Sequence, residues 1–595
     1  MKKSIFLIFF SLSAILLLTN FNTKNTRPLP VFQPSQTAQQ AFTALAMCTG
    51  GSSFMLDDFY LQRAPLFSNM GSFGYKVSTR SELAQKYFDQ GLKLTYGFNH
   101  SEAERSFTEA TKIDPNFAMA YWGKALALGP NINDPAPDKE RERKAWEAIV
   151  QAQALSKMVS QKEEDFIDAL AIRYMADTTK LNRDSLNEVY MKAMATLSKK
   201  YSEDTEILTL FAASIMNTMP WDYYDKSKKE KKNTAQAVEA LERVMKLNNE
   251  HPGAHHYYIH IVEASKNPDR GVPSADKLGE LVPASGHLVH MPSHIYARVG
   301  RYEDAANSNI EAIEADENYI AQCQAQGVYP LGYYPHNIHF LWMSASFQGK
   351  KEQSLNAAEK VANRVPIGMA TNMTFLQEFL AVPLQAYVRF GQWNDILTTP
   401  TPAEGLEQYR VFSHYARSIA FTRKGLFDKA KAEIEALDEL NETRQAKAEE
   451  VTPEVQKEMS TRDSMYARVP KNMYTITKNI SAAELAAAKG KHDKAIELLK
   501  EAVLAEDDLP YSEPPIWHQP VRHVLGAILV EAERYEEAVQ VYEEDLLHNR
   551  DNGWSLFGLH QSLKALGNNE DAKRIKVKFD KAWKDADVEL TSSRF

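Results

Sequence analysis

A pattern that repeats along the length of this 595-residue chain constrains its fold more than any other feature. In a clear early unit, Gly91, Ala103, Phe107, Ala110 and Pro115 stand at the spacings expected for two helices within 34 residues. Small residues occupy the places where the helices touch, an aromatic residue lies in the second helix, and proline ends it. One such hairpin cannot bury its apolar faces alone, so we expect neighbouring units to stack into a continuous array.

The same pattern returns in the second half of the chain. A turn glycine followed by a small residue of the second helix occurs in five further units, as Gly300 with Ala305, Gly349 with Ser354, Gly425 with Ala430, Gly490 with Ala495, and Gly567 with Ala572. Leu525-Gly526, Tyr535, Ala538 and Tyr542 give another unit. The pattern resembles the tetratricopeptide (TPR) repeat. The resemblance implies an all-α, right-handed superhelical solenoid of about ten to twelve helical hairpins, several of them degenerate.

The chain divides into segments of different character. We predict a signal peptide or N-terminal anchor over 1–22, a linker and irregular cap over 23–80, N-terminal TPR-like repeats over 81–250, His-rich TPR-like repeats over 251–365, middle repeats over 366–470, and C-terminal TPR repeats over 471–595. In the TPR family the first helix of each hairpin lines the concave side. We therefore expect the functional groove to be lined by these first helices.

The N-terminus favours export from the cell. Two lysines precede an apolar run from Ile5 to Leu18, which is typical of a secretory signal and short for a membrane span. The small-x-small cleavage pattern is missing, so an uncleaved anchor is the alternative. We expect an exported protein, periplasmic or on the cell surface, with no membrane span beyond this segment. In an oxidising compartment Cys48 and Cys323 either pair or remain two thiols.

Composition and missing motifs exclude several classes of function. The formal charge of −9 argues against a protein that binds nucleic acid by neutralising phosphates. The sequence contains no GxxxxGK[ST], GxGxxG, GxSxG or HExxH motif. Nucleotide-dependent enzymes, standard serine hydrolases and common zinc proteases are therefore disfavoured.

The histidines follow the register of the repeats. Four units have a small residue in the second helix at 275, 305, 354 and 538, and 15 residues before these positions stand His260, His290, His339 and His523. Counting back 18 residues from two of these positions gives His287 and His336, one helical turn earlier. Because the chain has only 16 histidines, chance agreement of three adjacent repeats is a poor explanation. The register predicts that imidazoles from neighbouring hairpins meet in the concave groove.

Within the His-rich repeats, His256 and His260 are spaced i, i+4, and His287, His290 and His294 are spaced i, i+3, i+7. Neutral imidazole is the commonest metal ligand, and a pair spaced by one turn can hold one ion. We predict metal ligands among His256, His260, His287, His290, His294, His336 and His339, with zinc or copper as the ion. Glu263 is a candidate metal ligand, a partner of a ligand, or the proton acceptor of a reaction.

Pro292 complicates this prediction, because it lies between His290 and His294. Proline inside a helix removes a hydrogen bond and usually kinks the helix. If Pro292 instead begins a helix, His287 and His290 belong to the approaching loop. The ligands then converge from a loop and a helix.

Four other residues are candidates for binding a ligand in the groove. Tyr296 and Trp342 belong to an aromatic-rich stretch that can wall a partly apolar pocket. Arg522 and His523 are several repeats away but face the cluster if the superhelix turns far enough, and Arg522 can hold a carboxylate or phosphate.

Two functional hypotheses follow. The first is an exported TPR protein with a His-rich groove site for a metal ion or ligand. If this site is catalytic, the protein is a metal-dependent hydrolase or oxidoreductase. The second is a metal-free scaffold that binds a small molecule, peptide or protein in its concave groove. A third reading of the histidines, structural packing, makes no functional claim.

Overall fold

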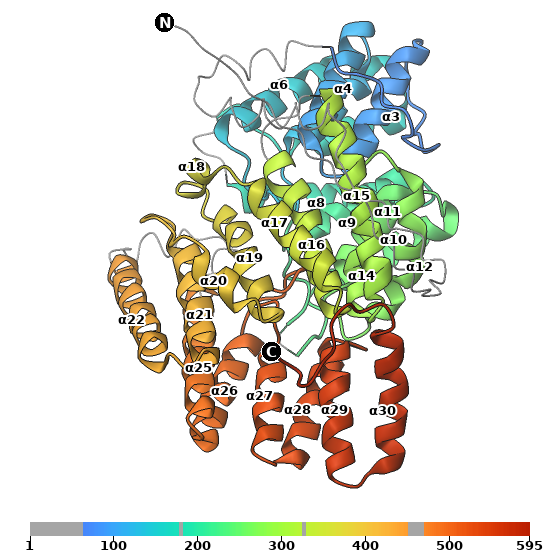
Figure 1. Ribbon diagram of the computed structural model, residues 1–595. Coiled ribbons are helices and arrows are strands. Elements are labelled where there is room, and N and C mark those ends of the chain that lie inside the picture. Colours follow the sequence, from blue (N-terminus) through green and yellow to red (C-terminus); the bar gives the residue numbers. More distant parts are fainter. Residues whose placement is uncertain (1–62, 178–181, 226, 324–328, 450–468) are drawn as a thin grey trace, which may run out of the picture.

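The computed structural model describes residues 63–177, 182–225, 227–323, 329–449 and 469–595. Helices follow one another along these residues, each packed mainly against its neighbours in the sequence (Figure 1). The single β-type contact in this part of the chain is an isolated bridge between Tyr224 and Glu230. The predicted all-α, TPR-like solenoid is confirmed. Its handedness and number of repeats stay predictions.

The first half of the array leads up to and includes the His-rich repeats. Its helices are α3 (Glu82–Tyr96), α4 (His100–Ile113), α5 (Ala118–Leu128), α6 (Lys139–Leu155), η2 (Ser156–Met158), α7 (Gln161–Ala171), α8 (Arg183–Lys200), α9 (Thr205–Met216), α10 (Thr234–Leu247), α11 (Pro252–Val262), η4 (Pro268–Gly271), α12 (Val272–Leu281), α13 (Gly286–His290), α14 (Pro292–Arg298), α15 (Tyr302–Cys323), η5 (Tyr329–Tyr333, a π-helical turn), α16 (Tyr334–Phe347) and α17 (Lys351–Asn363).

The second half continues the array to the C-terminus. Its helices are α18 (Ile367–Ala370), α19 (Leu376–Arg389), α20 (Trp393–Thr398), α21 (Glu407–Arg423), α22 (Phe427–Glu449), α25 (Val469–Ala488), α26 (His492–Asp507), α27 (Val521–Glu531), α28 (Tyr535–His548), α29 (Gly553–Ala565) and α30 (Asn569–Ala582). No described helix combines the length and apolar composition needed to cross a bilayer. The predicted signal segment and Cys48 lie outside the described residues, so export and the Cys48–Cys323 pairing stay predictions.

Local sequence explains where these helices begin and end. Polar side chains cap free backbone N–H groups at several N-termini, as Ser81 does for Ala84 and Asn99 does for Glu102. The five turn glycines found in the repeat pattern all adopt positive φ, between 69° and 80°. Glycine takes this left-handed conformation without steric cost, so it reverses the chain between the two helices of a hairpin.

Close packing of an aromatic ring on glycine joins successive hairpins. Phe107 of α4 fills the space that a side chain would need at Gly91 of α3 and Gly123 of α5. Near the C-terminus, Tyr542 of α28 packs in the same way on glycines of α27 and α29, Gly526 and Gly558. A β-carbon at any of these four glycines would meet the ring at 2.8 Å or less. The repeat pattern thus encodes the spacing between hairpins as well as the hairpins themselves.

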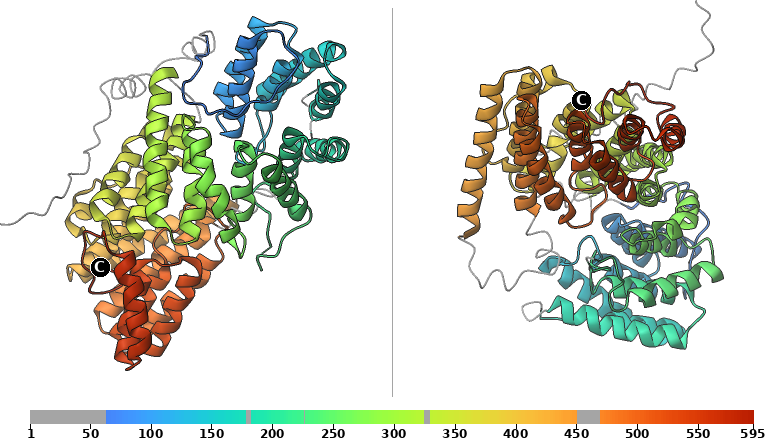
Figure 2. Two further views of the ribbon diagram at one scale, coloured as in Figure 1. Left: turned by 90° about the vertical axis from the view of Figure 1, so that its right-hand side faces the viewer. Right: turned by 90° about the horizontal axis from the view of Figure 1, so that it is seen from below.

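The array curves so that its C-terminal repeats contact the His-rich repeats (Figures 1 and 2). Arg550, at the end of α28, pairs with Asp269 at 2.8 Å, and the indole nitrogen of Trp554 donates to the carbonyl of Ser346 at 2.9 Å. These contacts join segments more than 200 residues apart. The curvature therefore places the segment between α26 and α27 against the His-rich helices.

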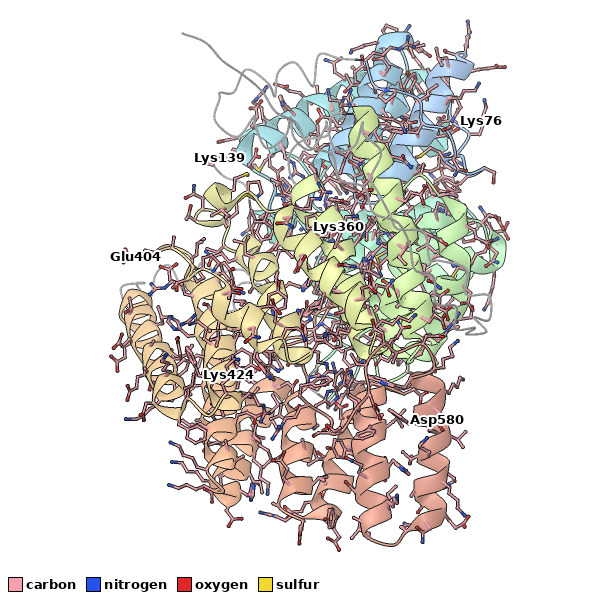
Figure 3. All side chains as sticks on the ribbon, viewed as in Figure 1. Lys76, Lys139, Lys360, Glu404, Lys424 and Asp580 are labelled. Carbon is pink, nitrogen blue, oxygen red and sulfur yellow. The ribbon has the colours of Figure 1, made fainter. Side chains whose placement is uncertain are left out.

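Histidines gather in the interior of this fold. Charged side chains such as Lys76, Lys139, Glu404, Lys424 and Asp580, labelled in Figure 3, are exposed. The histidines of the His-rich helices are almost all buried. Because histidine is seldom fully buried without a partner, this group calls for an explanation.

Candidate metal centre

Six histidines form one cluster inside the His-rich repeats, here called the six-histidine centre: His256, His260, His287, His290, His294 and His336. They come from four helices. α11 supplies the first two, α13 the next two, α14 the fifth and α16 the sixth. The first five are at most 3% exposed, and His336 is half-buried. The structure thus brings together six of the seven histidines predicted as ligands.

Pro292 shapes one side of this centre. α13 ends at His290, Met291 separates the two helices, and Pro292 is the first residue of α14. Proline suits a first helical position because its missing N–H has no helical partner there. His287 and His290 therefore belong to a short helix of their own, and His294 follows after the break. Convergence survives, with 4.8 Å between the ring centres of His290 and His294.

The six rings divide into two sets of three. In the first trio, His256, His260 and His287 each offer a nitrogen within 4.8 Å of the others. In the second trio, His290, His294 and His336 do the same. Three imidazoles are the protein ligand set of several zinc sites, and copper accepts the same donors.

Most of these rings are anchored through Nδ1. His256 Nδ1 lies 2.6 Å from the carbonyl of Tyr96, and His290 Nδ1 lies 2.7 Å from Oδ1 of Asn309. Glu263 takes the other two anchored rings, with 2.9 Å to His260 Nδ1 and 2.7 Å to His294 Nδ1. Each partner is an acceptor, so each Nδ1 carries the proton. Ligating histidines commonly use such a bond to fix the ring, with Nε2 left for the metal.

The opposite nitrogens have no comparable partners. Among the described residues, Nε2 of His256, Nε2 of His260 and both nitrogens of His287 are buried without a hydrogen bond. A buried donor or acceptor left in this state costs about 1–3 kcal/mol. Burial also lowers the pKa of His256, His287 and His290 well below the ordinary value, with neighbouring histidines adding to the effect. The rings are therefore neutral near pH 7 and their lone pairs are available to a metal.

The second trio contains one very short contact, which joins His290 and His294. Their Nε2 atoms lie only 2.8 Å apart. Asn309 donates its amide nitrogen to the carbonyl of Ala305 at 2.7 Å, so its oxygen must face His290. Glu263 fixes the proton of His294 in the same way. A contact this short between two ring nitrogens is a hydrogen bond, and a metal ion can enter only if they move apart to roughly 3.3 Å.

Glu263 connects the two trios. It follows the last residue of α11, is fully buried, and binds one histidine with each carboxylate oxygen. Burial by itself would raise its pKa, but the positive charge of His294 and hydrogen bonds from His260 and His294 hold the pKa at about 2. Two ligands of one tetrahedral zinc ion lie roughly 3.3 Å apart, so these shorter N···O contacts are hydrogen bonds with no room for an ion. The geometry favours the role of partner to two ligands.

Aromatic rings close the centre, and two of them lie in strained backbone. Phe98 stacks on His287 with 5.3 Å between ring centres, and Trp221 meets His260 edge-on at 4.9 Å. Both residues have positive φ, 53° and 63°. This conformation costs a non-glycine residue about 1–2 kcal/mol. Tertiary structure holds these residues in it, and such strain clusters at functional sites.

A large cavity lies between the His-rich helices and the C-terminal repeats. Its volume is about 550 Å³, and Arg298, Tyr302, Tyr511, Glu513 and Arg522 are among its lining residues. The hydroxyl of Tyr511 donates to Glu513 at 2.9 Å and lies 3.3 Å from Glu263. Tyr511 therefore joins the wall of the cavity to the carboxylate at the heart of the six-histidine centre.

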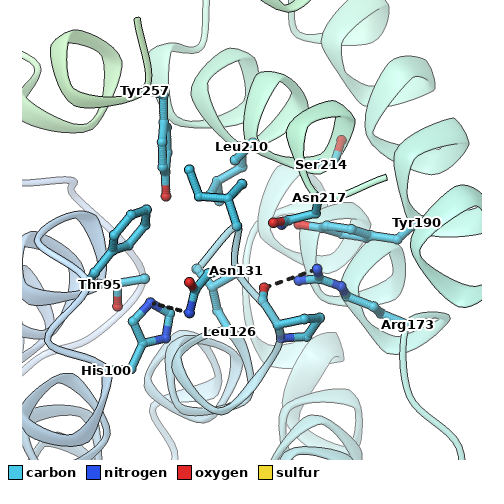
Figure 4. A pocket seen from close by; sticks show the side chains of 14 residues that line it. Thr95, His100, Leu126, Asn131, Arg173, Tyr190, Leu210, Ser214, Asn217 and Tyr257 are labelled. Carbon is cyan, nitrogen blue, oxygen red and sulfur yellow. Dashed lines mark hydrogen bonds between the residues drawn. The ribbon is translucent and has the colours of Figure 1, made fainter. Parts of the chain in front are cut away.

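A second, smaller cavity borders Phe98 on another side. Figure 4 shows His100, Asn131 and Arg173 among the residues around it. Its volume is about 30 Å³, which is room for one or two water molecules. His100 is held by the carbonyl of Ala127 at 2.7 Å. This cavity is too small for a substrate, so the larger one is the candidate binding space.

The remaining predicted residues lie outside the six-histidine centre. His339 stacks on Trp342 at 5.4 Å on another side of α16. Tyr296 donates its hydroxyl to Asp276 and packs against Arg301. Arg522 lines the large cavity between the His-rich helices and the C-terminal repeats.

His523 and Arg522 already have strong protein partners. Arg522 donates two hydrogen bonds of 2.8 Å to Asp507. Both ring nitrogens of His523 are bound, to Arg389 at 3.0 Å and Asp545 at 2.9 Å. These contacts give His523 a structural setting and leave Arg522 at the rim of the cavity.

Sequence reasoning missed several parts of the centre. Asn309, Phe98 and the carbonyl of Tyr96 complete it, yet they come from other positions in their units. Tyr511 belongs to the segment between α26 and α27, which reaches the centre only because the whole array curves. The composition around 510–520, rich in proline and aromatic residues, was the available signal for a functional segment, because such a composition interrupts the hairpin pattern.

Comparison with known proteins agrees with this architecture. A tetratricopeptide repeat family profile matches residues 522–553. A search of curated proteins found no match. Among solved structures, a human IFIT1 dimer with m7Gppp-AAAA aligns at 12% identity over 83% of this chain and 95% of its own, with a TM-score of 0.29. The APC/C hetero-tetramer Cut9–Hcn1 aligns at 12% identity over 92% of this chain and 83% of its own, also at 0.29. Scores this low carry no argument about function.

The matched segment covers α27 and α28 almost entirely. It contains Gly526 and Tyr542, which pack on each other in the same way as Gly91 and Phe107 do near the N-terminus. The profile and the recurring hairpins together identify a TPR repeat protein. TPR proteins generally bind protein or peptide partners, and the fold alone does not decide between a scaffold and an enzyme.

Proposed function

We propose that the six-histidine centre binds two transition-metal ions, one in each trio of imidazoles. Four of the six rings have Nδ1 fixed by an acceptor, which directs Nε2 to a metal. The single observation that carries the proposal is the first trio, in which Nε2 of His256, Nε2 of His260 and both nitrogens of His287 are buried without a hydrogen bond among the described residues, and each ring offers a nitrogen within 4.8 Å of the others. A cation bound there would give these atoms the partners that they lack.

The donor set narrows the choice of ion. All six ligands are imidazoles, which suit zinc and copper better than magnesium or calcium. Three protein ligands leave a coordination position for a water molecule or substrate, as in catalytic sites. We therefore infer a metal-dependent enzyme, a hydrolase if the ion is zinc and an oxidoreductase if it is copper. The large cavity beside Tyr511 is the space proposed for the substrate, and export stays part of this proposal.

Metal analysis of protein purified without a histidine tag tests the proposal. We expect about two equivalents of zinc or copper per chain, or uptake of two equivalents after treatment with a chelator. The double variant His260→Ala, His290→Ala removes one ligand from each trio and should lose both ions. His492→Ala removes a histidine from the start of α26, outside the centre, and should keep both.

A folded wild-type protein that contains no transition metal and binds neither zinc nor copper would contradict the proposal. The scaffold hypothesis would then stand, with a peptide or protein partner in the concave groove. Circular dichroism and the thermal midpoint of each variant show whether a loss of metal reflects a loss of ligands or a loss of fold.

A further inference from the structure

A second group of potential ligands lies apart from the six-histidine centre. α16 places His336 in that centre, and three residues later it places His339 in a different environment. There His339 meets His518, from the segment before α27, and Glu378, from the first turn of α19. These three residues come from distant parts of the sequence and share no ligand with the six-histidine centre.

The three donors are close enough for one ion. Each offers an atom within 4.8 Å of the other two. The ring centres of His339 and His518 lie 4.6 Å apart, and His518 Nε2 lies 4.0 Å from a carboxylate oxygen of Glu378. Ligands of one ion lie roughly 3.3 Å apart, so small side-chain rotations would complete the site.

Neither histidine has the partners that a structural histidine needs. His339 is 3% exposed and His518 is 5% exposed. Nε2 of His339 and both nitrogens of His518 have no hydrogen bond among the described residues. A packed aromatic cluster explains the position of these rings but leaves three buried polar atoms unsatisfied.

Glu378 also lacks a compensating charge. The described part of the chain supplies no lysine or arginine ion pair to it, and its closest cationic candidate is His518. A divalent cation would favour the ionised carboxylate and satisfy both imidazoles at once.

Two aromatic walls hold the rings in place. Trp342 stacks on His339 with an angle of 2° between planes, and it meets His518 edge-on at 4.5 Å. Phe379 contacts the other side of His339 at 5.4 Å. This packing orients both imidazoles in advance, which lowers the cost of ordering them around an ion.

We propose that His339, His518 and Glu378 form a mononuclear site for a divalent first-row transition metal. Two imidazoles and one carboxylate suit iron(II), cobalt(II) and zinc(II), and leave positions open for an outside ligand. His518 also lines the cavity of about 550 Å³. Through His518, the proposed site therefore borders the space that we assign to the substrate.

Titration with Co²⁺ alone, followed by visible absorption and by metal analysis, tests this site. The wild-type protein should bind three ions. His260→Ala, His290→Ala should bind one, and adding Glu378→Gln should weaken that ion by at least about 100-fold, the upper end of the loss seen when an outer partner is removed. Adding His518→Ala should abolish it. Glu404→Gln removes an exposed carboxylate and should change nothing.

The outcomes separate this site from the proposed function. If His260→Ala, His290→Ala retains no cobalt, or if Glu378→Gln with His518→Ala leaves the wild-type stoichiometry unchanged, the mononuclear site is wrong. If the wild-type protein binds only one ion and that pair of changes removes it, the six-histidine centre fails and this site stands. If the variant His260→Ala, His290→Ala does not fold, Glu378→Gln with His518→Ala is tested in the otherwise wild-type chain. There it must lower the number of bound cobalt ions from three to two.

Discussion

Both the His-rich repeats and the C-terminal repeats bury histidines, with opposite results for their hydrogen bonds. In the C-terminal repeats, His523 is bound through both nitrogens, and Asp545 also accepts hydrogen bonds from Ser555 and Asn552. In the His-rich repeats, neither ring nitrogen of His287 has a hydrogen bond to any described residue. Both rings are buried. The hydrogen bonds of a histidine, more than its burial, therefore indicate whether it is structural or free to bind a ligand.

The difference has an energetic meaning. A satisfied polar network stabilises its region, whereas unpartnered buried atoms cost free energy until something binds them. A metal ion that binds only the folded state recovers this cost and adds stability that grows with its concentration. The C-terminal repeats thus stabilise the array with or without metal. The His-rich repeats reach their full stability only when a metal ion is bound.

Exchanging each histidine for leucine gives the largest expected contrast. In metal-free protein, His523→Leu should lower the free energy of unfolding by about 3 kcal/mol, because Asp545 loses a hydrogen bond to a buried charge. His287→Leu removes two unsatisfied nitrogens and should be neutral or stabilising. Urea unfolding in the presence of a chelator measures both. An equal loss in the two variants would mean that His287 is structural, and the comparison would fail.

A matched pair of carboxylates sharpens the comparison at the next level. The two carboxylate oxygens of Glu263 accept hydrogen bonds from His260 and His294, and Glu263→Gln replaces one of these oxygens by an amide nitrogen that donates. One of the two rings then loses the partner that orients it. We expect zinc affinity to fall about 10–100-fold, or about 1.4–2.7 kcal/mol. Glu206 is equally buried and lies 2.8 Å from Nε2 of His251, outside the centre.

Competition with a chelator of known affinity measures this effect. Glu206→Gln changes the same chemistry at a structural histidine and should leave zinc affinity unchanged. If Glu263→Gln also leaves it unchanged, then Glu263 does not position ligands. A loss in both variants would indicate a general effect of buried charge.

The fold was more accessible from the sequence than the site. The turn glycines with positive φ and the packing of Phe107 on glycine are signals that lie within one or two hairpins. The pattern at Gly300 or Gly490 therefore predicted a hairpin turn without knowledge of the neighbouring repeats. The histidine register also depends on one repeat and the next. It predicted four of the six imidazoles of the centre, His260, His287, His290 and His336, whereas His339 and His523 lie elsewhere. Whether they bind metal stays a prediction.

Other features depend on distant parts of the chain. His339 shares its register position with His260 and His290 but packs instead against Trp342, Phe379 and His518. Its neighbours Glu378 and His518 meet only through the curvature of the whole array. Small rotations between hairpins add up over several repeats, and no local pattern in the sequence sets their sum.

Two buried aspartates extend the comparison to charge and give the smallest expected effect. Desolvation would raise the pKa of Asp545, but the charge of His523 and hydrogen bonds from His523, Ser555 and Asn549 hold it at about 2. Asp316, in the His-rich repeats, accepts hydrogen bonds from Tyr329 and Asn337, and burial raises its pKa to about 7.

The sign of the pH dependence follows from these values. Between about pH 4, the ordinary value for aspartate, and pH 7, folded Asp316 keeps a proton that the unfolded chain has lost, so stability falls as the pH rises. Asp316→Asn cannot ionise, and Asn337 can turn its unpaired oxygen to the new amide. We expect this variant to match the wild type near pH 4 and to be more stable at pH 8, because it has no buried carboxylate to ionise. Urea unfolding at both values measures the difference. A variant that is less stable at pH 8 would show that the Asp316 carboxylate is satisfied, and the contrast between the two regions would then be limited to their histidines.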